Sequence, residues 1–373
     1  MNRLSGFRGH RTAAGRAVRL VFGVTAASAM VLGMAGVGAG AAAAGTFMEA
    51  IPVGNGPDGV AVVPSGARVY VANFGDDSVS VVETAGNTVV DAINVGDGPQ
   101  GVAASARGSR VYVTNSLDDT VSVIRTGTNA VVDTVDVGDN PRGVAVSPFG
   151  SRVYVTNFSD DSVSVIDTRT NEVVETISVG DGPQFVAASP QGSRVYVTNT
   201  LDDTVSVIRT GSNTVVDTVN VGDAPTGVAV HPDGTYVYVS NSADGTLSVI
   251  EMFRNSVVDD ITVGDAPFGV AVASEGSSVY VTNEVGDSVS VIETSRNTVD
   301  DTIEVGDGPR GVVVTPGDSR VYVANNLGNT VSVIAVDTCS GSFCIGSGSL
   351  GSLGSLAGGS SPVGFGSTGS IGS

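Results

Sequence analysis

Seven residues of different chemical type recur at intervals of 42 residues, each directly after a proline. They are Asp58, Gln100, Arg142, Gln184, Thr226, Phe268 and Arg310. The surrounding segment, Val-Gly-Asp-x-Pro-x-Gly, keeps its proline and its first glycine in all seven copies. Guanidinium, amide, carboxylate and aromatic groups together offer fixed donors, acceptors and an apolar wall, as a site for a polar ligand requires. We therefore treat these seven as candidate ligand-binding residues, the alternative being random variation at a solvated position.

Few residues suit catalysis. After residue 44 the chain has one histidine, His231, in a turn where another copy has Ser147, so a Ser-His-Asp set cannot be assembled near the seven. No cluster of cysteine and histidine suggests zinc. A lactone hydrolase could work with arginine and carboxylate alone, and Asp58 with Arg142 or Arg310 is the only such group. We assign no catalytic residue and no cofactor.

The acidic residues are ordered as well. One set lies in the Val-Gly-Asp turns: Asp97, Asp139, Asp181, Asp223, Asp265 and Asp307. A second set follows the repeated asparagines: Asp76-Asp77, Asp118-Asp119, Asp160-Asp161, Asp202-Asp203, Asp244 and Asp287. Calcium would need six or more oxygen ligands, and no Asp-x-Asp-x-Asp loop or nearby glutamate completes such a shell. Aspartate that forms turns and keeps the surface soluble explains both sets, so we assign no metal site.

The elements that must position these residues follow from the repeat. Three residue types recur every 42 residues in seven copies: Tyr70 to Tyr322, Pro57 to Pro309 and Asn73 to Asn325. In one copy, turn residues separate four apolar or alternating runs, at 101–105, 110–115, 120–124 and 130–137. Four short strands per repeat of this length are typical of a β-propeller blade. We predict an all-β, seven-bladed propeller with four antiparallel strands per blade.

The ends of the chain support this count. The last copy has three strand patterns, at 311–315, 320–325 and 330–334, and no fourth. Residues 47–54 align with 89–96 after a shift of 42 residues, so the missing strand stands at the start. We expect this N-terminal strand to close the last blade. The connection that follows each fourth strand should then share a face with the loop between the second and third strands, around the central channel.

Four copies contain the tetrad Tyr-Val-Thr-Asn, ending at Asn115, Asn157, Asn199 and Asn283, and three copies vary its third residue. With longer segments such as 143–148 and 170–174, residues 46–338 resemble the YVTN-repeat propellers, a group that includes archaeal surface-layer proteins and bacterial exported proteins. This resemblance implies a seven-bladed propeller. Relatives in the wider group are often labelled lactonase-like, which describes a fold more than an activity.

The two flanking segments differ from the repeats. Residues 1–44 join a basic start, with five arginines before residue 20, to an apolar run and an Ala/Gly-rich end, which predicts a cleaved signal peptide rather than a retained membrane anchor. We divide the chain into this segment, a propeller over 45–338 and a tail over 339–373. Cys339 and Cys344 are the only cysteines and are expected to form a disulfide in an exported protein. The Gly/Ser-rich remainder predicts a flexible tail without a membrane span.

The net charge and the predicted export limit the classes of function that suit this protein. Past the leader, 13 arginines face 38 acidic residues, and a surface so acidic makes nucleic acid a poor partner. We predict a secreted or cell-envelope-associated binding or scaffold protein, a monomer, that contacts an envelope component or another protein through the channel mouth. The alternatives are a lactonase-like hydrolase at the same mouth and a structural unit of a surface coat.

Overall fold

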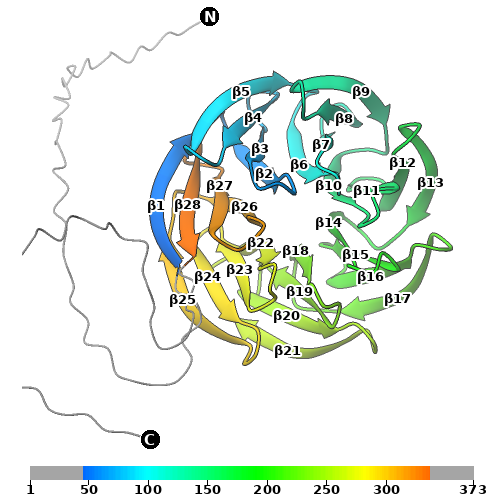
Figure 1. Ribbon diagram of the computed structural model, residues 1–373. Helices are drawn as coiled ribbons and strands as arrows, with labels where there is room; N and C mark the ends of the chain where they lie inside the picture. The colour runs from blue at the N-terminus through cyan, green and yellow to red at the C-terminus, as the bar shows by residue number, and fades with distance from the viewer. Residues whose placement is uncertain (1–44, 337–373) are drawn as a thin grey trace, which may run out of the picture. The chain divides into compact units, whose positions relative to one another are not determined.

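Each repeat folds as one antiparallel sheet because its apolar runs are short and Gly, Asn or Asp stands between them. The computed structural model describes residues 45–336, which form a ring of seven such sheets (Figure 1). The turn residues take up the backbone conformation that the reversals need: Asp119 has φ 58° and Asn129 has φ 47°. The predicted seven-bladed propeller is confirmed.

The first three blades have these strands, from the innermost outward. Blade 1 holds β2 (Pro57–Val62), β3 (Arg68–Asn73), β4 (Ser78–Glu83) and β5 (Thr88–Asn94). Blade 2 holds β6 (Pro99–Ala104), β7 (Arg110–Asn115), β8 (Thr120–Arg125) and β9 (Ala130–Asp136). Blade 3 holds β10 (Pro141–Val146), β11 (Arg152–Asn157), β12 (Ser162–Asp167) and β13 (Glu172–Ser178).

The next three blades repeat this order. Blade 4 holds β14 (Pro183–Ala188), β15 (Arg194–Asn199), β16 (Thr204–Arg209) and β17 (Thr214–Asn220). Blade 5 holds β18 (Pro225–Val230), β19 (Tyr236–Asn241), β20 (Thr246–Glu251) and β21 (Ser256–Thr262). Blade 6 holds β22 (Pro267–Val272), β23 (Ser278–Asn283), β24 (Ser288–Glu293) and β25 (Thr298–Glu304).

Blade 7 is built from both ends of the described chain. β26 (Pro309–Val314), β27 (Arg320–Asn325) and β28 (Thr330–Val336) are completed by β1 (Gly45–Pro52) as the outermost strand (Figure 1). β1 pairs antiparallel with β28 from Gly45 opposite Val336 to Pro52 opposite Thr330, with an irregularity between Phe47 and Glu49. The expected closure by the N-terminal strand is confirmed. Residues 1–44 and 337–373, and with them the leader, the cysteine pair and the tail, lie outside the described residues.

The strand register separates two faces of the ring. At one end of blade 3, Pro141 lies opposite Asn157 and Asn157 opposite Ser162, and we call this the mouth face. At the other end, Arg152 lies opposite Asp167 and Asp167 opposite Glu172, and we call this the turn face. The mouth face carries the connections between blades and the loops between second and third strands. The turn face carries the other two turns of each blade.

The recurring tyrosine and asparagine side chains have structural roles. All seven tyrosines are buried, and each packs in an apolar cluster with valines from two neighbouring blades. All seven asparagines are fully buried, and each Nδ2 donates to hydroxyls of the third strand, as Asn157 does to Ser162 and Ser164 at 2.9 Å. The repeat therefore encodes both the core between blades and the turn at the mouth face. Residues 45–336 contain no helix that is long and apolar enough to cross a membrane.

Candidate functional site

The seven sequence-predicted residues are the second residues of the seven innermost strands, which surround the channel (Figure 1). Each innermost strand begins two residues earlier than predicted because its proline pairs with the repeated asparagine, as Pro141 does with Asn157. The register then shifts before Val144, so Arg142 lies in an irregular strand start. Neighbouring starts approach closely: a Cβ on Gly143 would lie 2.7 Å from the carbonyl oxygen of Gln184. The backbone therefore holds the seven side chains in fixed places.

Arg310 joins two carboxylates at the mouth. Its Nη1 donates to Asp58 Oδ2 at 2.9 Å and its Nε donates to Glu284 Oε1 at 2.8 Å. Asp58 is buried, and burial raises the pKa of this carboxyl above its ordinary value, although the Arg310 charge offsets part of the rise. Burial acts to lower the pKa of Arg310, but the carboxylates of Asp58 and Glu284 outweigh it and raise the pKa overall. Arg310 thus neutralises charge within the wall.

Arg142 is held differently. Its guanidinium carbon lies 3.4 Å from the centre of the Phe158 ring, and its Nη1 donates to Gln184 Oε1 at 2.5 Å. The buried Nε has no hydrogen-bond partner among the described residues. Within residues 45–336 no carboxylate bonds to this arginine, and burial lowers its pKa. Since a buried unpartnered donor costs free energy, this Nε is an unsatisfied polar group in the wall of the mouth.

Phe268 forms the apolar part of the mouth together with Phe185. Their ring centres lie 5.5 Å apart with the planes at 88°, an edge-to-face arrangement that aromatic pairs favour. The Arg310 guanidinium lies 5.3 Å from the Phe268 ring centre. The structure therefore brings an aromatic wall beside the charged groups.

Thr226 and Gln100 take no part in these charged and aromatic contacts. The Thr226 hydroxyl is buried and is bonded within the wall, to Ser240 at 2.9 Å and to the carbonyl oxygens of Pro267 and Phe268 at 3.1 Å. It has a structural role in blade 5. Gln100 is partly buried, and none of the described residues hydrogen-bonds to its side chain. The seven positions thus comprise two bonded pairs, an aromatic wall, one structural hydroxyl and one free amide.

Three residues of the mouth were missed by the sequence reasoning: Phe158, Phe185 and Glu284. Phe158 and Glu284 follow the repeated asparagine, where the seven copies read Phe, Ser, Phe, Thr, Ser, Glu and Asn. Phe185 replaces the glycine that follows the varied residue in the other six copies. Both signals were visible as exceptions to the repeat. Only the packing of neighbouring blades brings these three side chains beside Arg142, Phe268 and Arg310.

The aspartates of the mouth face tie the turns together. Within a blade, Asp118 Oδ2 accepts a hydrogen bond from Asp97 N at 2.7 Å. Between blades, Asp119 Oδ1 accepts one from Asn140 N at 2.8 Å. Since the same pairs recur around the ring, these aspartates have a structural role, as expected from their turn positions. Within residues 45–336, no three His, Cys, Asp or Glu side chains form a group that could hold a metal ion.

His231 lies on the turn face, where the sequence placed it. Its Nδ1 contacts Asp233 Oδ1 at 2.6 Å and its Nε2 contacts the Gly276 carbonyl oxygen at 2.9 Å. Both ring nitrogens are therefore engaged in holding turns of blades 5 and 6. This histidine belongs to the framework and is remote from the channel mouth.

Comparison with known proteins agrees with this architecture. The family described as "Lactonase, 7-bladed beta-propeller" matches residues 166–263 and 259–344, and the family described as "YNCE-like beta-propeller" matches residues 101–191. Hydrazine synthase of Kuenenia stuttgartiensis has a similar fold, with a TM-score of 0.70 and 23% identity, over 75% of this chain and 96% of that chain. At this identity the likeness concerns the fold alone. No curated protein matched significantly.

Proposed function

From the premise that this chain is a seven-bladed β-propeller of the YVTN-repeat group, we propose that it is an exported binding protein whose ligand site is the channel mouth. The observation that carries this proposal is the state of Arg142. Its guanidinium is stacked on Phe158, anchored at one nitrogen by Gln184 and unpartnered at Nε. Because Arg142 is only partly buried, a ligand with a carboxylate or carbonyl oxygen could bond to the exposed part of its guanidinium.

The rest of the mouth defines the ligand class. Phe268 and Phe185 supply an apolar wall, and the Gln100 amide adds a free donor and acceptor. Arg310 is paired with both Asp58 and Glu284, so this group adds no free positive charge to the site. We infer a small or terminal group that is negative or strongly polar at one end and apolar at the other. The site is lined by fixed strand residues, which favours binding without rearrangement.

The proposed location outside the cytoplasmic membrane rests on the leader pattern of residues 1–44. With an envelope location, the ligand would be an envelope component or another exported protein. The acidic character of the protein opposes binding to nucleic acid, because like charges repel.

A pull-down tests the proposal. Residues 45–373 are mixed with envelope fractions of the source cells at low and at high salt, beside the variant Arg142→Gln. The control variant is Arg125→Gln, which removes an arginine from the turn face. We expect binding to survive high salt, to fall in Arg142→Gln by about tenfold, the effect of one charge-assisted contact, and to persist in the control. Equal binding by all three proteins would exclude the mouth as the site.

A hydrolase at the same mouth is the second candidate. It is favoured by the raised pKa of Asp58 beside Arg310 and by the lactonase family match. In that reaction Asp58 would accept a proton from water as the water attacks a lactone carbonyl oriented by Arg142. The ring C–O bond would then break, and the released alkoxide would take the proton from Asp58 to give the hydroxy acid. Assay of γ-butyrolactone and gluconolactone with wild type and Asp58→Asn distinguishes the two functions. Turnover that Asp58→Asn abolishes would establish the hydrolase, and absence of turnover with retained envelope binding would leave the binding protein.

A further inference from the structure

The turn face carries a second candidate binding site, where blades 3 and 4 meet. We call the contact between two neighbouring blades on this face a seam. At four seams, the arginine that starts the second strand crosses to the next blade, where it donates to a main-chain carbonyl and to a turn asparagine. Arg110, for example, donates to the Thr168 carbonyl oxygen at 2.6 Å and to Asn171 Oδ1 at 3.0 Å. Arg68, Arg194 and Arg320 make the equivalent pairs of bonds. Each of these arginines thus links two neighbouring blades by hydrogen bonds across the seam.

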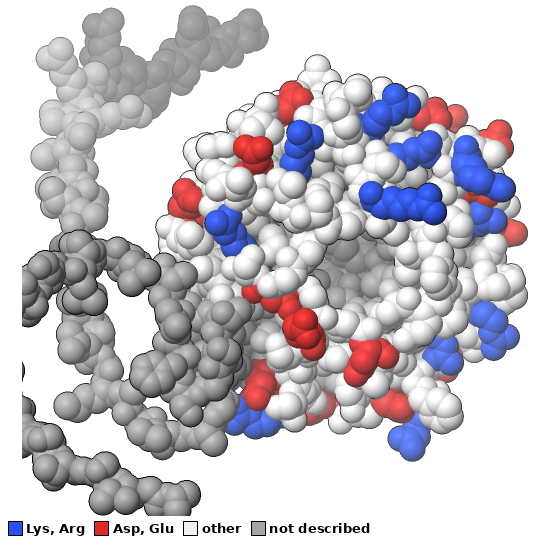
Figure 2. All heavy atoms as spheres, in the orientation of Figure 1, with Lys and Arg blue, Asp and Glu red and all other residues white. Residues whose placement is uncertain are grey.

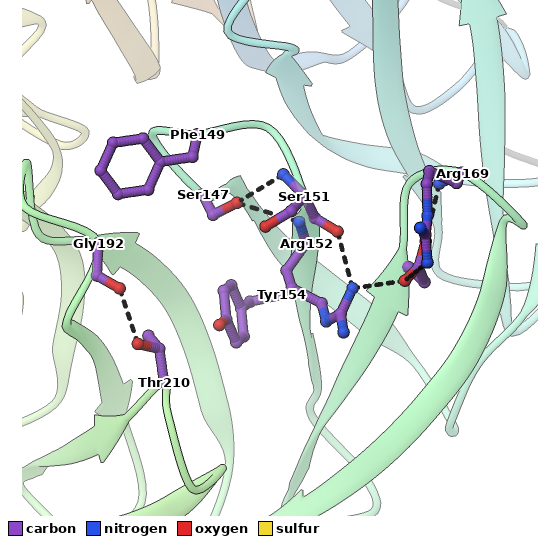
Figure 3. A pocket seen from close by; sticks show the side chains of 9 residues that line it. Ser147, Phe149, Ser151, Arg152, Tyr154, Arg169, Gly192 and Thr210 are labelled. Carbon is purple, nitrogen blue, oxygen red and sulfur yellow. Dashed lines mark hydrogen bonds and ion pairs between the residues drawn. The ribbon is translucent and has the colours of Figure 1, made fainter.

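Arg152 occupies the same position and does not cross. Its Nη1 donates to Asp167 Oδ2 in its own blade at 2.6 Å (Figure 3). Asp167 is itself fixed by the Arg169 backbone amide at 2.9 Å and lies 3.5 Å from the Arg169 guanidinium. The backbone hydrogen bond from Arg169 is the main reason that the pKa of Asp167 is low, so its carboxylate stays charged at neutral pH. Figure 3 shows Arg152 leading toward Arg169 and away from Thr210.

The seam between blades 3 and 4 therefore lacks an arginine that links the two blades. Among the described residues, no arginine reaches the Thr210 carbonyl or Asn213. Equivalent asparagines also donate to an aspartate of the preceding blade, as Asn171 Nδ2 does to Asp133 Oδ2 at 2.7 Å. At Asn213 the matching residue is Glu175, and that bond is not formed either. A pocket of about 480 Å³ occupies this seam, lined by Phe149, Arg152, Tyr154 and Thr210 among others.

A second hollow of about 370 Å³ adjoins it across Phe149 and Arg169, and is lined by Arg107 and Arg110. The linings of the two hollows together contain four arginines and one aspartate, on a protein of net charge −20. We call the two hollows the arginine groove. Figure 2 shows basic side chains gathered over the part of the ring that holds β8 to β13. Between the hollows, Phe149 is 79% exposed, and its ring lies against Gly192 of the next blade.

We propose that the arginine groove binds an acidic saccharide, such as a chain of uronic acid residues. Arg107 and Arg169 supply positive charge for the carboxylates, and Arg169 is 85% exposed. The exposed face of Phe149 offers a flat apolar surface for the C–H face of a sugar ring. The Thr210 carbonyl, which no arginine covers, accepts a hydrogen bond from a sugar hydroxyl. A simple anion would leave that acceptor unused, and for this reason the groove suits a polyhydroxylated anion. This inference is independent of the channel mouth, which lies on the opposite face.

The repeat itself supplies the sharpest variant. Asp167→Arg installs the residue that blades 2 and 4 have at this place, Arg125 and Arg209, and removes the carboxylate that holds Arg152. Arg152 should then cross the seam and close the pocket. The second variant is Phe149→Ala with Arg169→Gln. Its matched control is Phe253→Ala with Arg254→Gln, an exposed pair on the same face at blade 5, outside the groove.

The full chain is titrated with oligogalacturonate by calorimetry, with dextran and polyglutamate as comparison ligands. We expect oligogalacturonate alone to bind wild type, and to bind about tenfold more weakly in the Phe149/Arg169 variant, which loses a carboxylate contact and the apolar surface. In Asp167→Arg the added positive charge attracts any polyanion while the closed pocket loses its hydroxyl contact, so the preference for oligogalacturonate over polyglutamate should be lost in that variant. Asp167→Arg should not lower the unfolding temperature, and the control should bind as wild type does. Absence of binding to oligogalacturonate, or equal affinity in all variants, would overturn the proposal. Equal or tighter binding of polyglutamate by wild type would assign the groove to an acidic peptide and overturn it as well.

Discussion

At the scale of single residues, identical side chains in the seven copies have different surroundings. The hydroxyl groups of Tyr70 and Tyr322 donate to turn asparagines, Asn129 at 3.1 Å and Asn87 at 2.7 Å. Those of Tyr196, Tyr238 and Tyr280 are buried without a partner. The repeated tyrosine therefore contributes its ring to the core everywhere and its hydroxyl in some blades only. Its effect on stability differs from blade to blade.

Replacing tyrosine by phenylalanine should expose this difference. Tyr322→Phe removes a hydrogen bond and should lower the free energy of unfolding by about 1 kcal/mol. Tyr280→Phe removes a buried hydroxyl that bonds to nothing and should be neutral or stabilising. Urea unfolding of the two variants beside wild type measures both effects. Equal losses would mean that the Tyr280 hydroxyl has a partner, such as an ordered water.

The same tyrosines predict a response to alkaline pH. Burial raises the pKa of Tyr238 and Tyr280 from 10.0 to about 12. Since the folded pKa is the higher one, the stability that these groups contribute is complete below the unfolded value near 10 and is lost as the pH rises toward 12. The free energy of unfolding should therefore fall over this interval, and less steeply in Tyr280→Phe. An unchanged slope in that variant would contradict the assignment.

At the scale of elements, the constant glycines of the blade connections are explained by packing. A Cβ on Gly138 would lie 2.7 Å from Nδ2 of the buried Asn157, which is itself bonded to two serines. Asn157 cannot move away from an added Cβ without losing those two hydrogen bonds. The glycine is thus required by the asparagine of the same blade, although 19 residues separate them.

Gly138→Ala should destabilise the protein by about 2 kcal/mol, because overpacking of a filled site forces its neighbours to shift. Gly127 is the matched control, since an added Cβ there would contact nothing within 4 Å. Gly127→Ala should be neutral. Thermal unfolding of both variants measures the difference, and a tolerated Gly138→Ala would show that the connection is looser than described.

The closing strand is a second matter of elements. Ile51 of β1 is 4% exposed and belongs to the core between blades 7 and 1. Its counterpart one repeat later, Ile93 of β5, is 6% exposed. If β1 is a full member of blade 7, Ile51→Ala and Ile93→Ala should each cost about 3 kcal/mol, the range for a buried aliphatic side chain. A much smaller cost at Ile51 in urea unfolding would mean that the ring stays closed without this strand.

At the scale of the whole molecule, charge is distributed unevenly. Of the 13 arginines after the leader, only Arg142 and Arg310 lie at the mouth face, and the other 11 start or end strands or lie in turns at the turn face. Each face therefore presents different chemistry: acidic turns around a mouth of paired charges and aromatic rings on one side, arginines with an exposed phenylalanine on the other. The two binding proposals concern opposite faces.

The strong negative charge of the whole protein predicts a dependence on salt. Like charges repel more in the compact state than in the unfolded chain, and ions screen this repulsion. The unfolding temperature should therefore rise as sodium chloride is increased from low ionic strength to about 0.5 M, where the screening length falls below ~5 Å. A falling temperature would indicate that ion pairs such as Arg152–Asp167 outweigh the net repulsion.

The sequence alone determined the blade count, the strand order and the N-terminal closure, because a strict 42-residue period leaves one way to join seven sheets. It also placed seven varied side chains at the channel, since strand alternation and turn chemistry are local. Only the tertiary structure decided which of them meet. Arg310 bonds to Asp58 across the closure of the ring and to Glu284 of the neighbouring blade, and Arg152 turns from Thr210 to Asp167. Such choices depend on distances between blades, which a repeating sequence does not specify.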